Sequence, residues 1–133
     1  MMTSDFQFSN PLLTAFDFRI NREYNADAEE VDVALKISVS KKRTGEREAI
    51  VELTVEIGEK DDSAPFYINA TEGAFFKWEE NAFNGEKDID VLLDVNAPAL
   101  LLSYLRPIVA GITTASKYAS YNIPFINFNK SKK

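Results

Sequence analysis

The chain has 133 residues and a mass of 15.0 kDa, which is room for one domain with one hydrophobic core, and we assign residues 1–133 to it. With 15 basic and 21 acidic side chains its formal net charge is −6, and this balance disfavours nucleic-acid binding, which draws on basic residues to neutralise phosphates. The sequence contains no Cys and no His, so disulfides and thiolate or imidazole metal sites are excluded.

The same two absences weigh against an enzyme, because Cys and His are the commonest partners in nucleophilic and acid–base catalysis. The five glycines are dispersed and form no phosphate-binding loop. Glu52 and Glu56 share a strand face, and Asp61 precedes Asp62 in a turn, but both pairs are more simply explained as solvated carboxylates. We therefore expect no catalysis, no metal and no cofactor.

The N-terminal residues carry no basic segment followed by an apolar run, and no apolar stretch approaches about 18 residues without polar interruption. We expect neither a signal peptide nor a membrane span. The absence of Cys is compatible with a reducing compartment, and we expect the protein in the cytoplasm.

Apolar and polar residues alternate in three segments of the first half, at Phe16–Ile20, Val31–Val39 and Val51–Ile57. A period of two places apolar side chains on one face of a β-strand and polar side chains on the other. Two polar segments that contain Gly, Lys41–Glu46 and Gly58–Ser63, are typical of hairpin connections. The pattern predicts antiparallel strands with one buried and one wet face.

A fourth strand is predicted at about Pro65–Trp78, where the alternation changes phase near Gly73 and indicates a bulge or bend. Asp88–Asp94 is compatible with a short helix or with a strand. A longer helix then begins, with Asn96 near its N-cap and Pro98 in its first turn.

Within this helix, apolar residues recur at spacings of three and four, at Leu101, Leu102, Leu105, Ile108, Val109 and Ile112. Pro107 lies inside the run and is expected to kink the helix. Strands at about 12–78 and a helix at about 97–116 predict an α+β fold, in which a four-stranded antiparallel sheet carries the long helix on one face.

An aromatic loop follows at residues 117–128, where polar residues would be usual. It contains Tyr118, Tyr121, Phe125 and Phe128, and a second aromatic group, Phe75, Phe76 and Trp78, lies at the end of the fourth strand. These rings either cover the sheet as core or line a groove for apolar peptide, and the sequence leaves both interpretations open.

The stretch Pro98–Phe128 resembles the SecB export-chaperone family, which typically has a Leu-Phe-Pro-Tyr-x-Arg helix, a Gly-Gly-Phe-Pro loop and a Pro-x-Asn-Phe ending. The residues that match this pattern without a gap are Pro98, Leu101, Tyr104, Arg106, Asn127 and Phe128. The segment Pro65–Trp78 is also similar to the family's last strand, with Phe66, Gly73 and Phe76 at matching positions.

The resemblance implies a homotetramer, built as a dimer of dimers with helices between sheets, and an ATP-independent holdase that keeps unfolded polypeptide in apolar grooves. It implies groove aromatics at Phe66 and Tyr118. Tyr121 and Phe125 are further apolar candidates, and Phe76 and Trp78 complete the set that we expect to bind client. The implied partners are unfolded client proteins, together with either the SecA motor or an antitoxin.

Three departures from the family pattern bear on the biological role. Ser116–Ala119 stands in place of the Gly-Gly-Phe-Pro loop, Asn69 stands where an acidic residue helps to dock SecA, and we expect no counterpart of the family's second helix. Two uses stay open: delivery of preproteins to the Sec translocase, or antitoxin control in a toxin–antitoxin system, which the lost acid favours. The alternative is a non-catalytic adaptor or assembly protein with the same fold and one dedicated partner.

Overall fold

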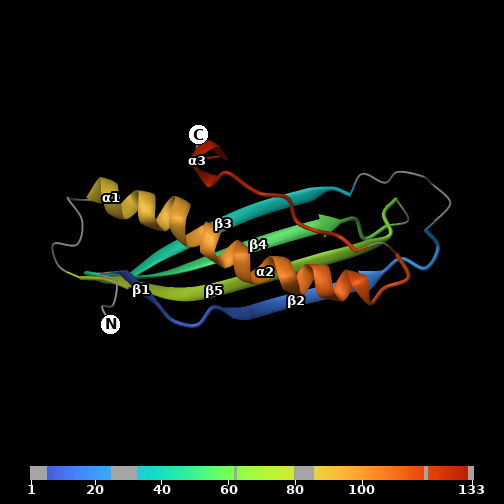
Figure 1. Ribbon diagram of the computed structural model, residues 1–133, viewed down its shortest axis with the longest axis horizontal. Coiled ribbons are helices and arrows are strands. Elements are labelled where there is room, and N and C mark those ends of the chain that lie inside the picture. Colours follow the sequence, from blue (N-terminus) through green and yellow to red (C-terminus); the bar gives the residue numbers. More distant parts are fainter. Residues whose placement is uncertain (1–5, 25–32, 62, 80–85, 119, 132–133) are drawn as a thin grey trace.

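The computed structural model describes residues 6–24, 33–61, 63–79, 86–118 and 120–131. Figure 1 shows strands crossed on one side by a long helix, from whose end the C-terminal segment returns along the molecule. The strands are β1 (Phe6–Phe8), β2 (Leu12–Ile20), β3 (Leu35–Gly45), β4 (Glu48–Gly58) and β5 (Phe66–Trp78). The helices are α1 (Glu86–Val91), the π-helical turn η1 (Leu92–Asn96), α2 (Ala97–Thr114) and α3 (Phe128–Ser131).

The sheet is antiparallel and four strands wide, because β1 and β2 pair with the same edge of β5. From that edge the order is β5, β4, β3. Phe6 lies opposite Trp78 and Leu12 opposite Gly73, so the two short strands form one interrupted edge strand. The break falls at Pro11, which cannot donate a backbone hydrogen bond to a ladder. The four-stranded prediction is confirmed in this sense.

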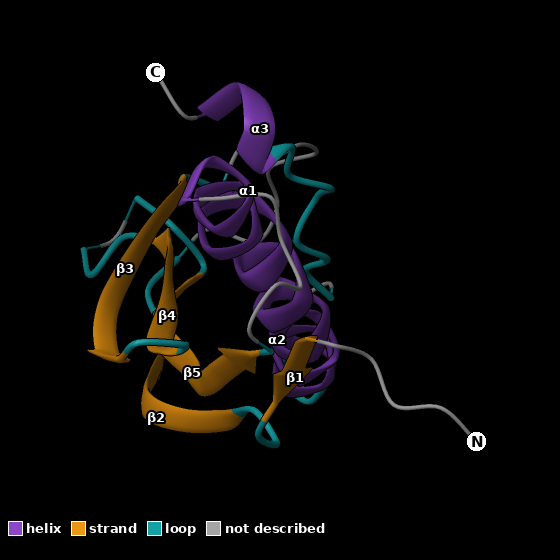
Figure 2. Ribbon diagram, turned by 90° about the vertical axis from the view of Figure 1, so that its left-hand side faces the viewer, coloured by secondary structure: helices purple, strands orange, loops and turns teal. Residues whose placement is uncertain are grey.

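The hydrophobic core lies between the helices and the inner face of β4 and β5, and the end-on view shows the strands curving around one side of the helices (Figure 2). Along β4 every second side chain is fully buried, at Ala49, Val51, Leu53, Val55 and Ile57. Leu101, Leu105 and Val109 of α2 are equally buried opposite them. Burial of each large aliphatic side chain contributes roughly 1.5–3 kcal/mol, so this layer supplies most of the driving force for folding.

The long helix agrees with its prediction in position, but its start differs. Asn96 makes no side-chain capping bond, because the chain is already helical through α1 and η1, and the N–H of Ala97 donates to the carbonyl of Leu92. The wider π-helical turn comes immediately before Pro98, whose ring would clash with the carbonyl four residues earlier in an ordinary α-helix. Asp88–Asp94, which the sequence left undecided, is helical.

Two strand predictions need correction. Lys41–Thr44 was expected in a hairpin loop, yet β3 continues to Gly45 and the turn to β4 is tight, because polar side chains fit an exposed edge strand as well as a loop. The phase change expected near Gly73 is also wrong: the inward positions of β5 continue from Ala70 to Ala74 through Glu72. Of the second predicted strand, Val31–Val39, the residues Val31 and Asp32 lie outside the described residues.

One helical stretch, Asp88–Thr114, is long and apolar enough by length and mean hydropathy to cross a membrane. It carries the core residues Leu101, Leu105 and Val109, which pack against the sheet. A core helix of a domain can have the same length and mean hydropathy as a membrane-spanning helix. The expectation of no membrane span therefore stays a prediction.

Candidate functional site

A row of apolar side chains on the helix side of β2 is only partly covered. Phe16 lies opposite Ala70, and Ile20 opposite Phe66, so both point to the same side as the core. The helix α2 packs mainly on β4 and β5, and it leaves Leu13 41%, Phe16 38% and Ile20 42% exposed. Together with Phe8 of β1, which is 43% exposed, these residues form what we name the β2 apolar row.

A β-bulge at Thr14 brings Leu13 into this row. The register of β2 against β5 shifts between Leu13 and Ala15, so one extra residue is accommodated there. Without the bulge, Leu13 and Phe16 would lie on opposite faces, because side chains alternate along a strand. The hydroxyl of Thr14 can donate its single proton either to Glu52, at 3.3 Å, or to the carbonyl of Thr71, at 3.4 Å.

Three of the six predicted client-binding residues, Phe66, Phe76 and Trp78, are buried, with exposures of 2%, 0% and 6%. Two of them pack against rings of the β1–β2 edge: Phe66 lies 6.3 Å from Phe18 of β2, and Phe76 lies 6.1 Å from Phe8 of β1, measured between ring centroids. In a single chain, a client could contact these three rings only after the surrounding packing had opened. The burial of these three rings fits the interpretation that they cover the sheet as core, which is one of the two interpretations that the sequence left open.

The other three predicted residues lie on the C-terminal segment. The hydroxyl of Tyr118 donates to the carbonyl of Asn21 over 2.7 Å, and Tyr121 packs edge-on against Phe66, where burial raises the pKa of its phenol. Both rings are half-buried. Phe125 is different, because 85% of it is exposed. Among the six predicted residues, Phe125 is therefore the most accessible to an unfolded client polypeptide.

The outward side of α2 carries a second apolar stripe. Leu100 is half-buried there, whereas Tyr104 is 41% and Ile108 is 36% exposed. Gly111 continues the stripe, and a Cβ built on it would meet no atom within 4 Å. We name these four residues the α2 stripe, and it forms a surface without bulky polar side chains that another helix could approach closely.

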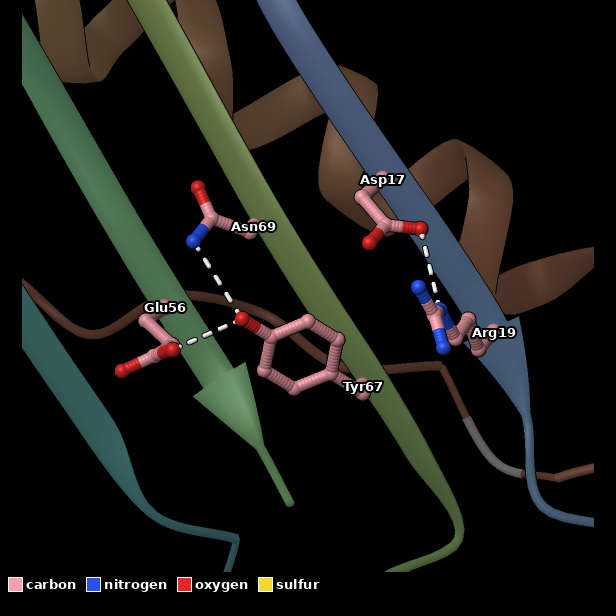
Figure 3. Close-up of polar contacts among 5 residues, drawn as sticks. All are labelled: Asp17, Arg19, Glu56, Tyr67 and Asn69. Atoms are coloured by element: carbon pink, nitrogen blue, oxygen red, sulfur yellow. Dashed lines mark hydrogen bonds and ion pairs between the residues drawn. The ribbon is translucent and has the colours of Figure 1, made fainter. Parts of the chain in front are cut away.

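Part of the outer face of the sheet, around Tyr67, is polar (Figure 3). The hydroxyl of Tyr67 donates to Glu56 over 2.7 Å and accepts from Asn69 over 3.2 Å, and the bond to Glu56 is the main cause that raises the pKa of Tyr67. Arg19 pairs with Asp17 along β2. Glu56 thus interacts with the phenol of Tyr67 and with Lys36, and not with Glu52, the other member of the carboxylate pair considered from the sequence. No group of three or more possible metal ligands occurs among the described residues.

The other carboxylate pair considered from the sequence, Asp61 and Asp62, has a structural role at Asp61. Its side chain accepts hydrogen bonds from the N–H and the hydroxyl of Ser63, and these bonds lower the pKa of its carboxyl. This arrangement stabilises the turn between β4 and β5. Asp62 lies outside the described residues.

Residues 5–131 match the family model of SecB, described as preprotein translocase subunit SecB. The chain belongs to the SecB family. Among solved structures, it is similar to the SecB-like chaperone Rv1957 of Mycobacterium tuberculosis in complex with a ChAD peptide from the Rv1956 HigA1 antitoxin. The TM-score is 0.74 at 11% identity, over 91% of this chain and 90% of that one.

A protein of unknown function from Streptococcus agalactiae is also similar, with a TM-score of 0.55 at 11% identity, over 93% of this chain and all of that one. No curated protein matches the sequence. At these identities the solved structures show a shared fold.

The residues that match the SecB motif have structural places in this fold. Leu101 and Phe128 are buried in the core, and Pro98 is buried at the start of α2. The Nε of Arg106 donates to the carbonyl of Ile123 over 2.9 Å and so fastens the C-terminal segment to α2. The remaining two are Tyr104, on the α2 stripe, and Asn127, whose side chain accepts from the N–H of Asn129 at the start of α3.

Proposed function

We propose that this SecB family member is an ATP-independent holdase that binds unfolded polypeptide on the β2 apolar row. The observation that carries the proposal is the partial exposure of Leu13, Phe16 and Ile20 on the side of the sheet that normally forms core. Monomeric proteins rarely expose contiguous apolar side chains without a partner for them. Phe125 of the C-terminal segment, with Tyr118 and Tyr121, is a second contact surface in this proposal.

The free energies expected for client binding are suited to transient binding of an unfolded polypeptide. A client side chain that becomes fully buried contributes roughly 1.5–3 kcal/mol, and micromolar binding requires about 8 kcal/mol in addition to the cost of ordering the client. Several apolar contacts on one subunit reach that range, and further subunits that hold the same client add avidity. Such binding needs no nucleotide, since release follows when the client folds or passes to a partner.

Two features support antitoxin control over preprotein delivery as the biological use. The structurally similar Rv1957 is bound to an antitoxin peptide. In addition, Asn69 lies in the polar network on the outer sheet face, where the family resemblance implies an acid that docks SecA. Binding of purified SecA, or of an antitoxin encoded beside this chain, distinguishes the two uses.

We also propose a cytoplasmic homotetramer, assembled as a dimer of dimers. The α2 stripe supports this, because its partly exposed Tyr104 and Ile108 suit burial against helices of other subunits. Such burial leaves the β2 apolar row and Phe125 as the surfaces for client.

Client binding is tested with Phe16→Ala, for which Phe75→Ala is a matched control. Phe75 belongs to the same sheet and is 50% exposed, but it lies on the outer face, opposite Ile50. We expect Phe16→Ala to weaken binding of a denatured client about tenfold and to reduce the suppression of its aggregation. Phe75→Ala should leave both near the wild type. Light scattering during dilution of the client from denaturant measures the effect.

If the two variants hold client equally well, the β2 apolar row is not the binding surface. If the wild type binds one protein selectively and fails to protect a generic unfolded client, the adaptor alternative applies instead.

Assembly is tested with Ile108→Glu, with Ala99→Glu as the control on another exposed side of α2. A charge within a buried helix contact is costly, so Ile108→Glu should shift the assembly from tetramer towards smaller species, whereas Ala99→Glu should not. Multi-angle light scattering gives the mass directly. A wild type with a mass near 15 kDa would refute the tetramer.

A further inference from the structure

A buried carboxylate lies beside the β2 apolar row. Glu72 of β5 is on the helix side of the sheet, opposite Leu13 of β2, and only 2% of it is exposed. Its other cross-strand neighbour is Leu53, and Ala70 and Ala74 are the next inward residues of β5. The neighbours of Glu72 in the sheet are therefore apolar, and one of them belongs to the surface that we propose for client.

The carboxyl group of Glu72 has no partner that would stabilise its charge. Its Oε1 accepts no hydrogen bond in the described part of the chain. Burial raises the pKa of this carboxyl, and no ion pair among the described residues offsets that effect. The charged form of Glu72 therefore depends on whatever solvent lies close to it.

The charged and titratable side chains on the surrounding elements are directed elsewhere. On the three strands their register places them on the outer face of the sheet. On α2, one donates to the carbonyl of Ile123 and the other lies on the α2 stripe. These side chains are Asp17 and Arg19 of β2, Glu48, Glu52 and Glu56 of β4, Tyr67 and Lys77 of β5, and Arg106 and Tyr104 of α2.

A client on the β2 apolar row would remove the water nearest to this carboxyl. Leu13 is 41% exposed, so in the free protein solvent lies within one side chain of Glu72. A client that covers Leu13 and Phe16 replaces this solvent with apolar groups, which destabilises the charged carboxylate far more than the neutral acid. Because linkage is reciprocal, a client that favours protonation of Glu72 binds more tightly once Glu72 is protonated.

We propose that Glu72 couples client binding to the uptake of one proton, so that the β2 apolar row holds apolar client more tightly in acid and releases it as the pH rises. This inference rests on the proposed holding function and names a regulation of the same surface. The affinity is greatest below the pKa of Glu72 in the free protein, which already lies above the ordinary value of 4.5. It falls as the pH rises through that pKa and levels off above the still higher pKa of the client complex.

The probe is a peptide of about nine leucine, phenylalanine and serine residues, with blocked ends and a fluorophore that is insensitive to pH, so that the peptide itself does not titrate. We expect the wild type to bind it about tenfold more tightly at about pH 5 than at about pH 8, because a further shift of one pKa unit corresponds to a tenfold change in affinity. Fluorescence anisotropy gives the affinities.

Two variants assign the effect to one carboxyl group. Glu72→Gln is neutral at every pH, so it should bind the probe at the higher pH as tightly as the wild type does in acid and lose the pH dependence. Glu52→Gln removes a carboxyl from the outer face of β4 and should keep the dependence. Circular dichroism verifies that each protein stays folded over the pH range.

Calorimetry in buffers of different ionisation enthalpy counts the protons taken up when the probe binds. At intermediate pH the wild type should take up protons, to a limit of one for each subunit that binds the probe, and Glu72→Gln should take up none. A purely structural role of Glu72 would change the affinity without changing this count.

Equal affinity of the wild type at both pH values overturns the proposal, as does a folded Glu72→Gln protein that keeps the pH dependence. Failure of the wild type to bind the probe at any pH would contradict the holding function itself, and this inference with it. Phe16→Ala is measured at constant pH, so the binding surface and its regulation are tested by separate experiments.

Discussion

Glu72 occupies a place in which carboxylates are rarely found. It lies on the helix side of β5 between Ala70 and Ala74 and is 2% exposed. Its cross-strand neighbours on that side are Leu53 and Leu13, and its Oε1 has no hydrogen-bond partner among the described residues. Burial raises the pKa of its carboxyl, because the charged form loses water and gains no compensating partner.

Replacement of Glu72 by Met should therefore stabilise the protein at neutral pH by about 1–2 kcal/mol, since an unsatisfied buried polar group is removed. The folded-state pKa lies above the ordinary value of 4.5, so the stability of the wild type falls as pH rises from that value through the raised pKa. The gain from Glu72→Met should accordingly shrink in acid.

Urea denaturation at several pH values measures this difference. Glu52→Gln is the control, because Glu52 lies on the outer face of β4 and accepts from Thr14. If Glu72→Met increases the free energy of unfolding equally at acid and neutral pH, ionisation of the buried carboxyl is not what destabilises the wild type.

At the scale of elements, Gly58 determines how β4 ends. It has a φ of +80°, and a Cβ built there would lie 2.0 Å from the carbonyl oxygen of Phe66. Gly58→Ala should lower the free energy of unfolding by at least about 2 kcal/mol, through the unfavourable φ and the displaced start of β5. Gly45→Ala, where a Cβ would make only ordinary contact with Glu48 at 3.8 Å, should change the free energy of unfolding by less than about 1 kcal/mol. Thermal unfolding of both variants compares them, and equal losses would contradict the steric argument.

Periodicity predicted most of the elements, because it reports which side of a strand or helix is buried. The period of two located β4 and β5, and spacings of three and four located α2. The predictions were wrong where a local sequence pattern is compatible with two structures. Lys41–Thr44 is as polar as a loop yet forms an edge strand, and Glu72 interrupts an apolar alternation that the backbone continues. The π-helical turn before Pro98 has no sequence signature of its own.

At the scale of the whole molecule, the candidate site was harder to predict than the fold. Whether an aromatic ring is core or surface depends on where α2 lies across the sheet, and a single sequence does not specify that position. Phe66, Phe76 and Trp78 lie within the buried layer, whereas Phe16 remains partly exposed on β2. The Thr14 bulge, which adds Leu13 to the β2 apolar row, likewise depends on pairing with β5. By contrast, the family resemblance was confirmed over residues 5–131.

The pairing of β1 and β2 with β5 has a consequence for synthesis of the chain on the ribosome. Phe6 lies opposite Trp78, and Ile20 lies opposite Phe66. The strands β1 and β2 are translated first, but they can pair only after β5, the last strand of the sheet, has been synthesised. Meanwhile the hairpin of β3 and β4 can form from local contacts alone. The nascent protein thus passes through a stage in which its own early strands are exposed, unpaired and apolar, the condition that it is proposed to guard against in other proteins.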